Sequence, residues 1–179
     1  MSAHDARFLW FREIVDPAPA DRLLEIGPGS SDSLAVLAEP LDTGYIVGID
    51  RSATAVARAA KRHAALIESG RVRVRQLALE ELTREHAAEL APGGFDKILA
   101  VNVNVFWTRD PAAELAVLRE SLAPGGALHL FYGYGEPGDR TSTAAATTPR
   151  NLIDHLTGAG FDVGTVSSGE LLGVIATPR

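Results

Sequence analysis

A glycine-rich turn is the first segment of the chain whose residue types could hold a ligand. It reads Glu25-Ile26-Gly27-Pro28-Gly29-Ser30-Ser31 and follows an apolar, strand-like run that begins at Arg22. Gly27 and Gly29 let the backbone bend sharply, approach a ligand closely and direct the next helix N-terminus toward it. A Gly-x-Gly pair alone fits a plain strand-to-helix turn equally well, so the neighbouring residues have to identify the ligand.

Two carboxylates sharpen the interpretation of this turn. Glu25 lies at the end of a strand expected to be buried, where a charge is costly unless a partner neutralises it. The α-amino group of a bound amino-acid moiety, directly or through water, would be such a partner. Asp50 ends the second strand-like run, 21 positions after Gly29. An acid at about this spacing meets a ribose diol in nucleotide-binding sheets.

Two kinds of nucleotide compete for such a turn. A dinucleotide site would place a third glycine at position 32, which is Asp32 here. A pyrophosphate would meet this carboxylate at the start of a helix, which is unfavourable. An adenosine joined to a zwitterionic amino acid carries no phosphate to repel. A nicotinamide-dependent oxidoreductase is therefore the less favoured alternative.

Strand-like runs and helical segments alternate along the chain and would position this turn. The strand-like runs are Arg22 to Ile26, Tyr45 to Ile49, Val72 to Leu77, Phe95 to Val103 and Ala127 to Tyr132. The helical segments are residues 3 to 15, Ser31 to Glu39, Ser52 to Ser69, Glu80 to Leu90 and Pro111 to Leu122. Such alternation predicts a mostly parallel sheet with helices on both faces.

The end of the chain departs from this alternation. A helix is predicted from Thr148-Pro149 to Gly158, followed by two strand-like runs, Phe161 to Ser167 and Leu171 to Thr177. Only Ser168-Gly169-Glu170 joins the two runs. Because so short a link cannot hold a crossover helix, the runs should pair antiparallel as a hairpin.

Composition excludes several classes of function. The 179 residues fit one domain, and the absence of cysteine excludes disulfides, thiolate zinc sites and thiol nucleophiles. The net charge of -6, from 17 basic and 23 acidic residues, argues against a nucleic-acid substrate. No apolar stretch approaches the ~20 residues of a membrane span, and charges interrupt residues 1 to 15, so neither a membrane segment nor a signal peptide is expected. Cytoplasm is the expected location.

Neither a metal site nor a catalytic base can be read from the sequence. The five histidines form no metal-spaced pair, and no Ser-His-Asp or paired-carboxylate arrangement is legible. His63, His86 and His155 fall on helical segments and are expected at the surface or at helix caps. His129 lies within the fifth strand-like run, where a structural role is expected. The catalytic residues are unassigned, and no metal is predicted.

Taken together, four ordered segments resemble the class I S-adenosylmethionine-dependent methyltransferases. They are Leu24 to Gly29, Val47 to Ser52, Phe95 to Val103 and Leu118 to Leu128. The resemblance covers essentially residues 20 to 179. It implies a three-layer α/β/α sandwich around a seven-stranded, mostly parallel sheet of order 3-2-1-4-5-7-6, with one antiparallel strand in the C-terminal hairpin. Residues 20–179 would form the S-adenosylmethionine-binding domain, and residues 1–19 a lid-like N-terminal helix and linker.

The same resemblance assigns residues to the cofactor, S-adenosylmethionine. The predicted contacts are Glu25, Gly27, Gly29, Ser31, Asp50, Arg51, Ala78, Leu79 and Asn102. Asp50 would accept from the ribose hydroxyls, and Arg51 would lie beside the adenine. Ser31 replaces the third glycine of the family motif and could cap the following helix. Ala78 replaces an Asp that contacts the adenine amino group in many members, which leaves backbone groups and the apolar Leu79 to recognise the base.

The methyl acceptor is expected to be a small molecule of unidentified structure. The predicted pocket residues are Trp10, Phe106, Trp107, Tyr132 and Tyr134. Phe106 and Trp107 either surround the sulfonium by cation–π attraction or pack the next helix. The roof would be the N-terminal helix, this aromatic pair and the loop 133–147. The pocket would be open or completed by a second chain in a homodimer. A non-catalytic S-adenosylmethionine-binding or regulatory module is the alternative, and Ala78 is its best support.

Overall fold

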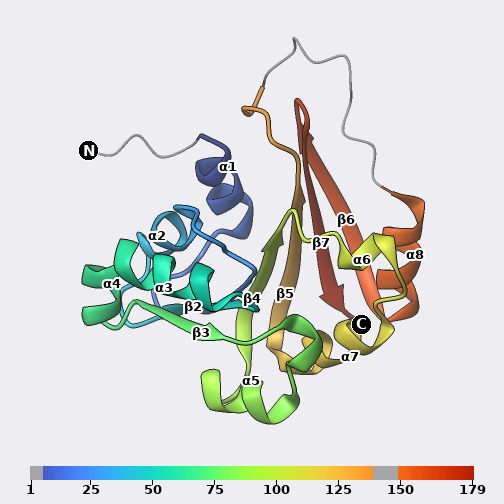
Figure 1. Cartoon of the computed structure of the whole chain (residues 1–179). Coiled ribbons are helices and arrows are strands. Elements are labelled where there is room, and N and C mark those ends of the chain that lie inside the picture. The colour runs from blue at the N-terminus through green and yellow to red at the C-terminus, as the bar shows by residue number, and fades with distance from the viewer. Residues whose placement is uncertain (1–5, 139–148) are drawn as a thin grey trace.

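Seven strands form a single sheet in the computed structural model, which describes residues 6–138 and 149–179 (Figure 1). The strands are β1 (Arg22–Ile26), β2 (Tyr45–Asp50), β3 (Val72–Gln76), β4 (Phe95–Val101), β5 (Leu122–Tyr132), β6 (Phe161–Ser168) and β7 (Leu171–Pro178). Their order is β3-β2-β1-β4-β5-β7-β6. β7 pairs antiparallel with both β5 and β6, and the other neighbours pair parallel. The predicted order and hairpin are confirmed.

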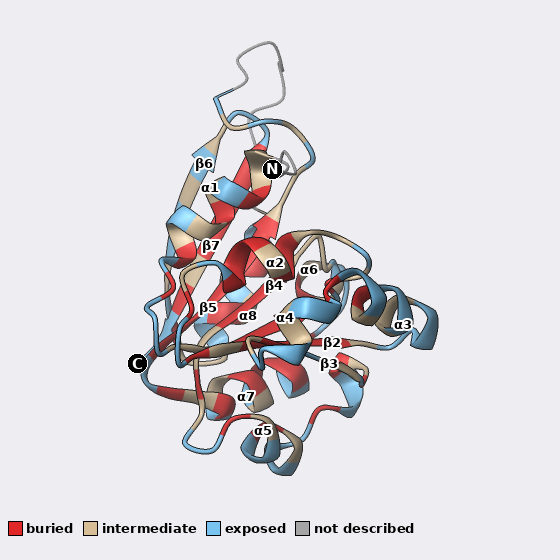
Figure 2. Ribbon diagram, turned by 90° about the vertical axis from the view of Figure 1, so that its left-hand side faces the viewer, coloured by how far each residue is buried: buried red, intermediate tan, exposed pale blue. Residues whose placement is uncertain are grey.

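Helices cover both faces of this sheet and bury an apolar core against each (Figure 2). One face carries α1 (Ala6–Val15), α2 (Ser33–Ala38), α3 (Ala53–Arg62) and α4 (Ala64–Glu68). The other carries α5 (Arg84–Leu90), α7 (Ala112–Ser121) and α8 (Arg150–Gly158). The 3₁₀ turn η1 (Leu79–Glu81) and the short α6 (Val105–Thr108) follow β3 and β4. The three-layer prediction is therefore confirmed.

The N-terminal helix α1 is anchored to the sheet by aromatic packing. Phe11 is 1% exposed and stacks on Phe131 of β5 with ring centroids 4.4 Å apart. Trp10 meets the same ring edge-on at 6.1 Å. Because stacked and edge-on pairs add to area burial, α1 belongs to the core of the domain. Residues 1–5 lie outside the described part of the chain, and a lid-like role for residues 1–19 stays a prediction.

Two predicted helices are interrupted. The segment 52–69 is divided into α3 and α4 at His63, whose backbone leaves the helical region (φ −106°, ψ 23°) and whose side chain is 4% exposed. His63 is the C-cap of α3 and the N-cap of α4, so its predicted place at a helix cap is confirmed, but its side chain is buried rather than at the surface. Gly70 follows α4 with φ +80°, as a capping glycine should. The segment 80–90 is divided into η1 and α5, and the Thr83 side chain caps α5.

Two strand boundaries also differ from expectation. β4 ends at Val101 rather than Val103, because Asn102 adopts φ +54° and turns the chain out of the sheet. β5 begins at Leu122 rather than Ala127, because Leu122 already pairs with Phe95 before the register shifts. β4 is thus shorter and β5 longer than predicted, and the order of the strands is unchanged.

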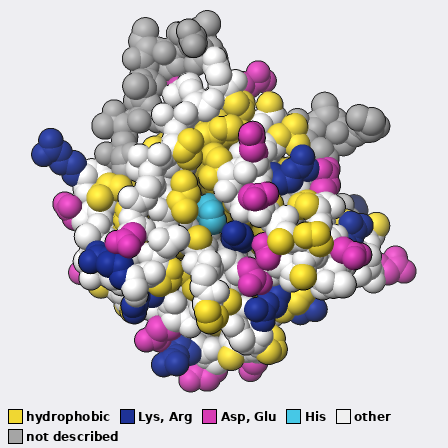
Figure 3. All heavy atoms as spheres, turned by 180° about the vertical axis from the view of Figure 1, so that it is seen from behind, with side chains coloured by type: hydrophobic (Ala, Val, Ile, Leu, Met, Phe, Trp, Pro, Cys, Tyr) yellow, Lys and Arg dark blue, Asp and Glu magenta, His cyan; other side chains and the backbone are white. Residues whose placement is uncertain are grey.

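The surface is mixed in charge. Seen from behind, acidic and basic side chains are interspersed over the coloured part of the surface (Figure 3). Within residues 6–138 and 149–179, no helix is long and apolar enough to cross a membrane. The same ranges hold no group of three or more acidic or histidine side chains arranged to bind a metal ion.

Candidate functional site

A pocket of about 360 Å³ opens at the carboxyl ends of the central strands. The residues that line it end or directly follow four strands. They are Ile26 and Gly27 at β1, Ile49, Asp50 and Arg51 at β2, Leu77, Leu79 and Glu80 after β3, and Asn102, Val103, Asn104 and Val105 after β4. The strand order reverses between β1 and β4, whose ends both reach the pocket. Ligands of open α/β sheets bind at such a switch point.

The glycine-rich turn forms one wall of this pocket. Gly27 and Gly29 have φ of +66° and +61°, a region that glycine occupies without strain. The Gly27 amide donates to the Ile49 carbonyl at 2.8 Å, which joins the turn to β2. A Cβ at Gly27 would lie 3.4 Å from the Val103 side chain, in the gap between the two walls. The missing side chain therefore keeps this gap open.

Asp50 is held at the rim of the pocket by two backbone amides. Its Oδ2 accepts from Gly29 N–H at 3.2 Å, and its Oδ1 accepts from Ser52 N–H at 2.9 Å. Each carboxylate oxygen has a second acceptor site beyond these bonds. The predicted ribose acceptor is thus fixed in direction at the pocket, with capacity left for hydroxyl donors.

Glu25 lies behind the turn as a buried carboxylate. It is 1% exposed, and Ser33 Oγ donates to its Oε1 at 2.6 Å. Its Oε2 is buried and meets no hydrogen-bond donor among the described residues. Burial raises the pKa of Glu25 to about 7, and the Ser33 bond opposes the rise only in part. An ammonium group brought to this carboxylate would stabilise its charged form and so lower its pKa again.

Asn102 ties the ends of β4 and β5 together beside the pocket. Its Nδ2 donates to the Gly133 carbonyl at 3.1 Å, and its Oδ1 accepts from Gly133 N–H at 2.9 Å. Its own amide donates to the Phe131 carbonyl at 2.8 Å. Asparagine is among the residues that best tolerate the positive φ found here. The side chain predicted to touch the cofactor is therefore also a brace of the pocket wall.

The wall after β3 differs from the prediction. Leu77 and Leu79 present apolar side chains, but Ala78 is not among the lining residues. Its amide donates to Glu81 Oε2 at 3.4 Å. Glu80 lines the pocket instead, and its Oε1 accepts from Arg109 at 3.1 Å. The sequence reasoning missed Glu80, although an acid two residues after Ala78 was the available signal.

The predicted aromatic residues do not line this pocket. Phe106 is fully buried, and Trp107 packs against the same core. Tyr132 donates to the Val103 carbonyl at 3.2 Å, Tyr134 is 80% exposed, and Trp10, on α1, packs against Phe131 of β5. Part of the predicted roof, residues 139–147, lies outside the described residues. Acceptor contacts by these aromatic residues stay a prediction.

Four predicted cofactor contacts also stand away from the pocket surface: Glu25, Gly29, Ser31 and Ala78. The first three support the turn through the bonds among Glu25, Ser33, Ser31 and Asp50. Gly27, Asp50, Arg51, Leu79 and Asn102 are brought together as expected. Contact of any of these residues with a cofactor stays a prediction.

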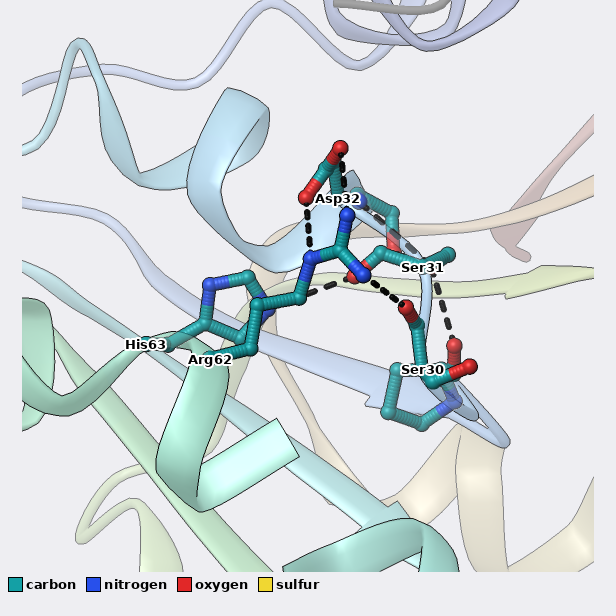
Figure 4. Close-up of polar contacts among 7 residues, drawn as sticks. Ser30, Ser31, Asp32, Arg62 and His63 are labelled. Carbon is teal, nitrogen blue, oxygen red and sulfur yellow. Dashed lines mark hydrogen bonds and ion pairs between the residues drawn. The ribbon is translucent and has the colours of Figure 1, made fainter. Parts of the chain in front are cut away.

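Asp32 changes the argument that disfavoured a dinucleotide. Its carboxylate faces the Arg62 guanidinium, with Nε–Oδ1 at 2.5 Å and Nη2–Oδ2 at 3.0 Å (Figure 4). This pairing neutralises the charge that would repel a pyrophosphate. The antiparallel β7 between β5 and β6 still disfavours a dinucleotide-binding fold, because the standard fold of that kind has strand order 3-2-1-4-5-6.

His129 keeps the structural place expected of it. It is 3% exposed, and its ring stacks at 6.3 Å on Phe131 beneath α1. Burial and the nearby Lys97 lower the pKa of His129 to about 4, so the ring is neutral at neutral pH. His129 is not among the residues that line the pocket.

Comparison with known proteins decides the family. A family model described as a methyltransferase domain matches residues 24–128, which include the turn, the pocket strands and the start of β5. The chain belongs to the methyltransferase domain family. The predicted resemblance to class I methyltransferases is therefore confirmed for family and fold.

Solved structures share the fold at low sequence identity. The glycopeptide N-methyltransferase MtfA, complexed with S-adenosyl-L-methionine, has a TM-score of 0.71 and is 15% identical; the match covers 99% of this chain and 88% of that one. The [4+2]-cyclase SpnF has a TM-score of 0.67 and is 21% identical, over 92% of this chain and 62% of that one. One architecture thus occurs in proteins of different named activity.

A curated relative is much longer than this chain. An uncharacterised protein of Synechococcus sp. strain PCC 6301 is 36% identical over 117 residues, which is 65% of this chain and 26% of that protein. The chain therefore spans about a quarter of the length of the curated relative it matches.

Proposed function

We propose that this methyltransferase domain binds S-adenosylmethionine in the pocket at the β1–β4 switch point and transfers its methyl group to a small-molecule acceptor. The observation that carries the proposal is the pairing of two acids around one turn. Asp50 offers acceptor sites for a ribose at the pocket rim, and Glu25 holds a buried oxygen without a donor among the described residues. A nucleoside in the pocket would donate to Asp50, and its cationic amino-acid part would reach Glu25, which lies behind the turn, directly or through water.

The rest of the pocket fits the same ligand. Leu77 and Leu79 offer an apolar wall for a flat base, and Gly27 leaves room for close approach. The buried carboxylate of Glu25 suits an ammonium because the opposite charge stabilises the ionised form that burial disfavours. Glycopeptide methyltransferase MtfA, which has this fold, was crystallised with S-adenosyl-L-methionine. Fold, family and pocket chemistry therefore support one cofactor.

The chain contributes positioning rather than acid–base chemistry. When bound, S-adenosylmethionine supplies an electrophilic methyl group on a sulfonium. The turn and Asp50 orient the ligand, and the Asn102–Gly133 bonds hold the opposite wall. Fixing two reactants in line and excluding water lowers the barrier without a dedicated base. Asp50 and Glu80 are the acids that line the pocket, and both are engaged by hydrogen bonds.

The acceptor side of the proposal rests on charge and shape. A net charge of -6 and interspersed surface charges favour a small molecule over a nucleic acid (Figure 3). The pocket is open on its acceptor side or completed by a second copy of the chain. The proposal places the protein in the cytoplasm.

A non-catalytic cofactor-binding module is the second candidate. Ala78 favours it, because no side-chain acceptor for the adenine amino group stands at this position. The [4+2]-cyclase with the same fold shows that this architecture is also found with another named activity. The two candidates differ in whether the methyl group leaves the cofactor.

A calorimetric titration with S-adenosylhomocysteine and then with NAD tests the cofactor assignment. We expect heat with the first ligand only, and Asp50→Asn should bind it about ten- to a hundredfold more weakly, since a charge-assisted hydrogen bond contributes about 1.5–3 kcal/mol. Asp42→Asn, on an exposed loop, is the matched control. Heat with NAD alone would overturn the proposal. Incubation with methyl-labelled cofactor and a panel of amine, hydroxyl and thiol acceptors separates enzyme from binding module.

A further inference from the structure

The C-terminal end of α3 is hydrogen-bonded to the end of the glycine-rich turn and to the residue that follows it. Arg62, the last residue of α3, binds both carboxylate oxygens of Asp32 at 2.5 and 3.0 Å. Its Nη1 also donates to the Ser30 carbonyl at 3.0 Å. The next residue, His63, donates from Nε2 to the Ser31 carbonyl at 3.3 Å. The last two residues of the turn, Ser30 and Ser31, and the following Asp32 are therefore held by Arg62 and His63 at the C-terminal end of α3 (Figure 4).

Asp32 is not used as a helix cap, although it occupies the capping position of α2. Its side chain makes no capping hydrogen bond. Aspartate at this position usually accepts from the first free amides of the helix. Here its carboxylate is committed to Arg62, and Ser31 Oγ lies 3.4 Å from the Ser33 amide instead. The Asp32 side chain therefore connects α3 to the segment after the turn and does not cap α2.

The interior side of the turn is fixed by a second set of bonds. Ser31 Oγ donates to the Pro28 carbonyl at 2.9 Å and lies 2.6 Å from Ser33 Oγ. Ser33 in turn donates to Glu25 at 2.6 Å. Ser31, whose carbonyl accepts from His63, is therefore connected through Ser33 to the carboxylate proposed to meet the cofactor ammonium.

The other end of α3 is fixed to the pocket rim. Ser52 caps α3 through Ala55 N–H at 3.2 Å, and its own amide donates to Asp50. A ten-residue helix is a rigid rod of about 15 Å. It begins beside the ribose acceptor and ends beside Ser30, Ser31 and Asp32, so the two ends of α3 are bonded to the two segments that meet at the Asp50–Gly29 contact.

We propose that Arg62 and Asp32 are a positioning pair, which holds the glycine-rich turn in its cofactor-receiving conformation without touching the cofactor. This inference rests on the proposed function. Two glycines with positive φ give the free turn many conformations. Without the pair, the cofactor has to order the turn as it binds, and the entropy lost in ordering the turn weakens the affinity for the cofactor.

Calorimetry with S-adenosylhomocysteine on single and double variants tests the pair. We expect Arg62→Met and Asp32→Asn each to weaken binding about tenfold, as for loss of one charge-assisted contact. The double variant should bind no more weakly than the weaker single one, because both changes remove the same contact. Arg62→Lys should recover part of the affinity, since an ammonium keeps the charge but not the fork. Arg84→Met, which removes the exposed Arg84–Glu120 pair, should bind as the wild type does.

Hydrogen exchange of the ligand-free proteins gives a readout independent of the cofactor. Amides of residues 29–33 should exchange faster in Arg62→Met than in the wild type, while the strands keep their protection. Equal affinity of wild type and Arg62→Met, or additive losses of affinity in the double variant, would refute the positioning role of the pair and leave the proposed function standing. A wild type that binds no S-adenosylhomocysteine would overturn the proposed function, and the pair's role in it, even if the turn amides respond as expected.

Discussion

Replacement of Glu25 by glutamine changes one buried charge and almost no volume. In the ligand-free fold the pKa of Glu25 rises from 4.5 to about 7. At 1.36 kcal/mol per pKa unit, this corresponds to about 3 kcal/mol between the two protonation states. Because the folded state binds this proton more tightly, the contribution to stability is complete below pH 4.5 and is lost as the pH rises through 7. Glu25→Gln removes this dependence.

Cofactor binding should reverse the preference of Glu25 for its proton. An ammonium beside Oε2 stabilises the carboxylate, so binding at low pH expels the proton. From a pKa of about 7, the protein should release about 0.9 proton per site at pH 6 and about 0.1 at pH 8. Affinity for S-adenosylhomocysteine should accordingly rise with pH and level off above about pH 7.

Calorimetry in buffers of different ionisation enthalpy measures this release directly. Wild type and the control Glu68→Gln, which changes an exposed acid of α4, should release the same number of protons as each other at pH 6 and at pH 8. Glu25→Gln should show no pH-dependent release and bind about ten- to a hundredfold more weakly at pH 8. Denaturant unfolding of the ligand-free proteins at pH 4.5 and 8 gives the stability half of the linkage. Equal proton release by wild type at both pH values would refute the role given to Glu25.

Three further changes follow from the geometry of the pocket. Gly27→Ala should weaken cofactor binding at least tenfold in a calorimetric titration, because φ is +66° and the new methyl points at Val103. Asn102→Gly should keep the backbone at φ +54° and lose only the two side-chain bonds to Gly133. Asn102→Ala should lose the same bonds and also strain the backbone, so it should be the less stable variant in denaturant unfolding. A lower unfolding midpoint for Asn102→Gly than for Asn102→Ala would contradict this. Phe11→Ala should destabilise the fold by about 3–5 kcal/mol in denaturant unfolding, because the ring is buried against Phe131; a loss below 1 kcal/mol would show that α1 is not part of the core.

Features that depend on short sequence windows were predictable. The alternation of strands and helices, and the three-residue link between the last two strands, led to the correct class of sheet. Gly70 after α4 and the carboxylate at the end of β2 were found for the same reason, since caps and strand ends have local signatures. The full strand order required the resemblance to a family.

Features that depend on distant partners were not predictable. His63 interrupts a helix to reach the Ser31 carbonyl, 32 residues away. Asn102 leaves β4 for Gly133, 31 residues away. Periodicity describes neighbours within a turn or two and carries no information about such partners. For that reason the sequence pointed to Asp32 as an isolated charge, and the structure shows it paired with Arg62.

The Asn102–Gly133 bonds have a thermodynamic consequence for the affinities of the two ligands. Asn102 faces the cofactor pocket, and Gly133 is the first residue after β5, on the side proposed for the acceptor. Any acceptor that shifts Gly133 also shifts the wall against which the cofactor lies. If the acceptor changes the affinity for the cofactor in this way, linkage requires that the cofactor change the affinity for the acceptor by the same factor. The Asn102–Gly133 bonds would in this way couple the binding of the two ligands.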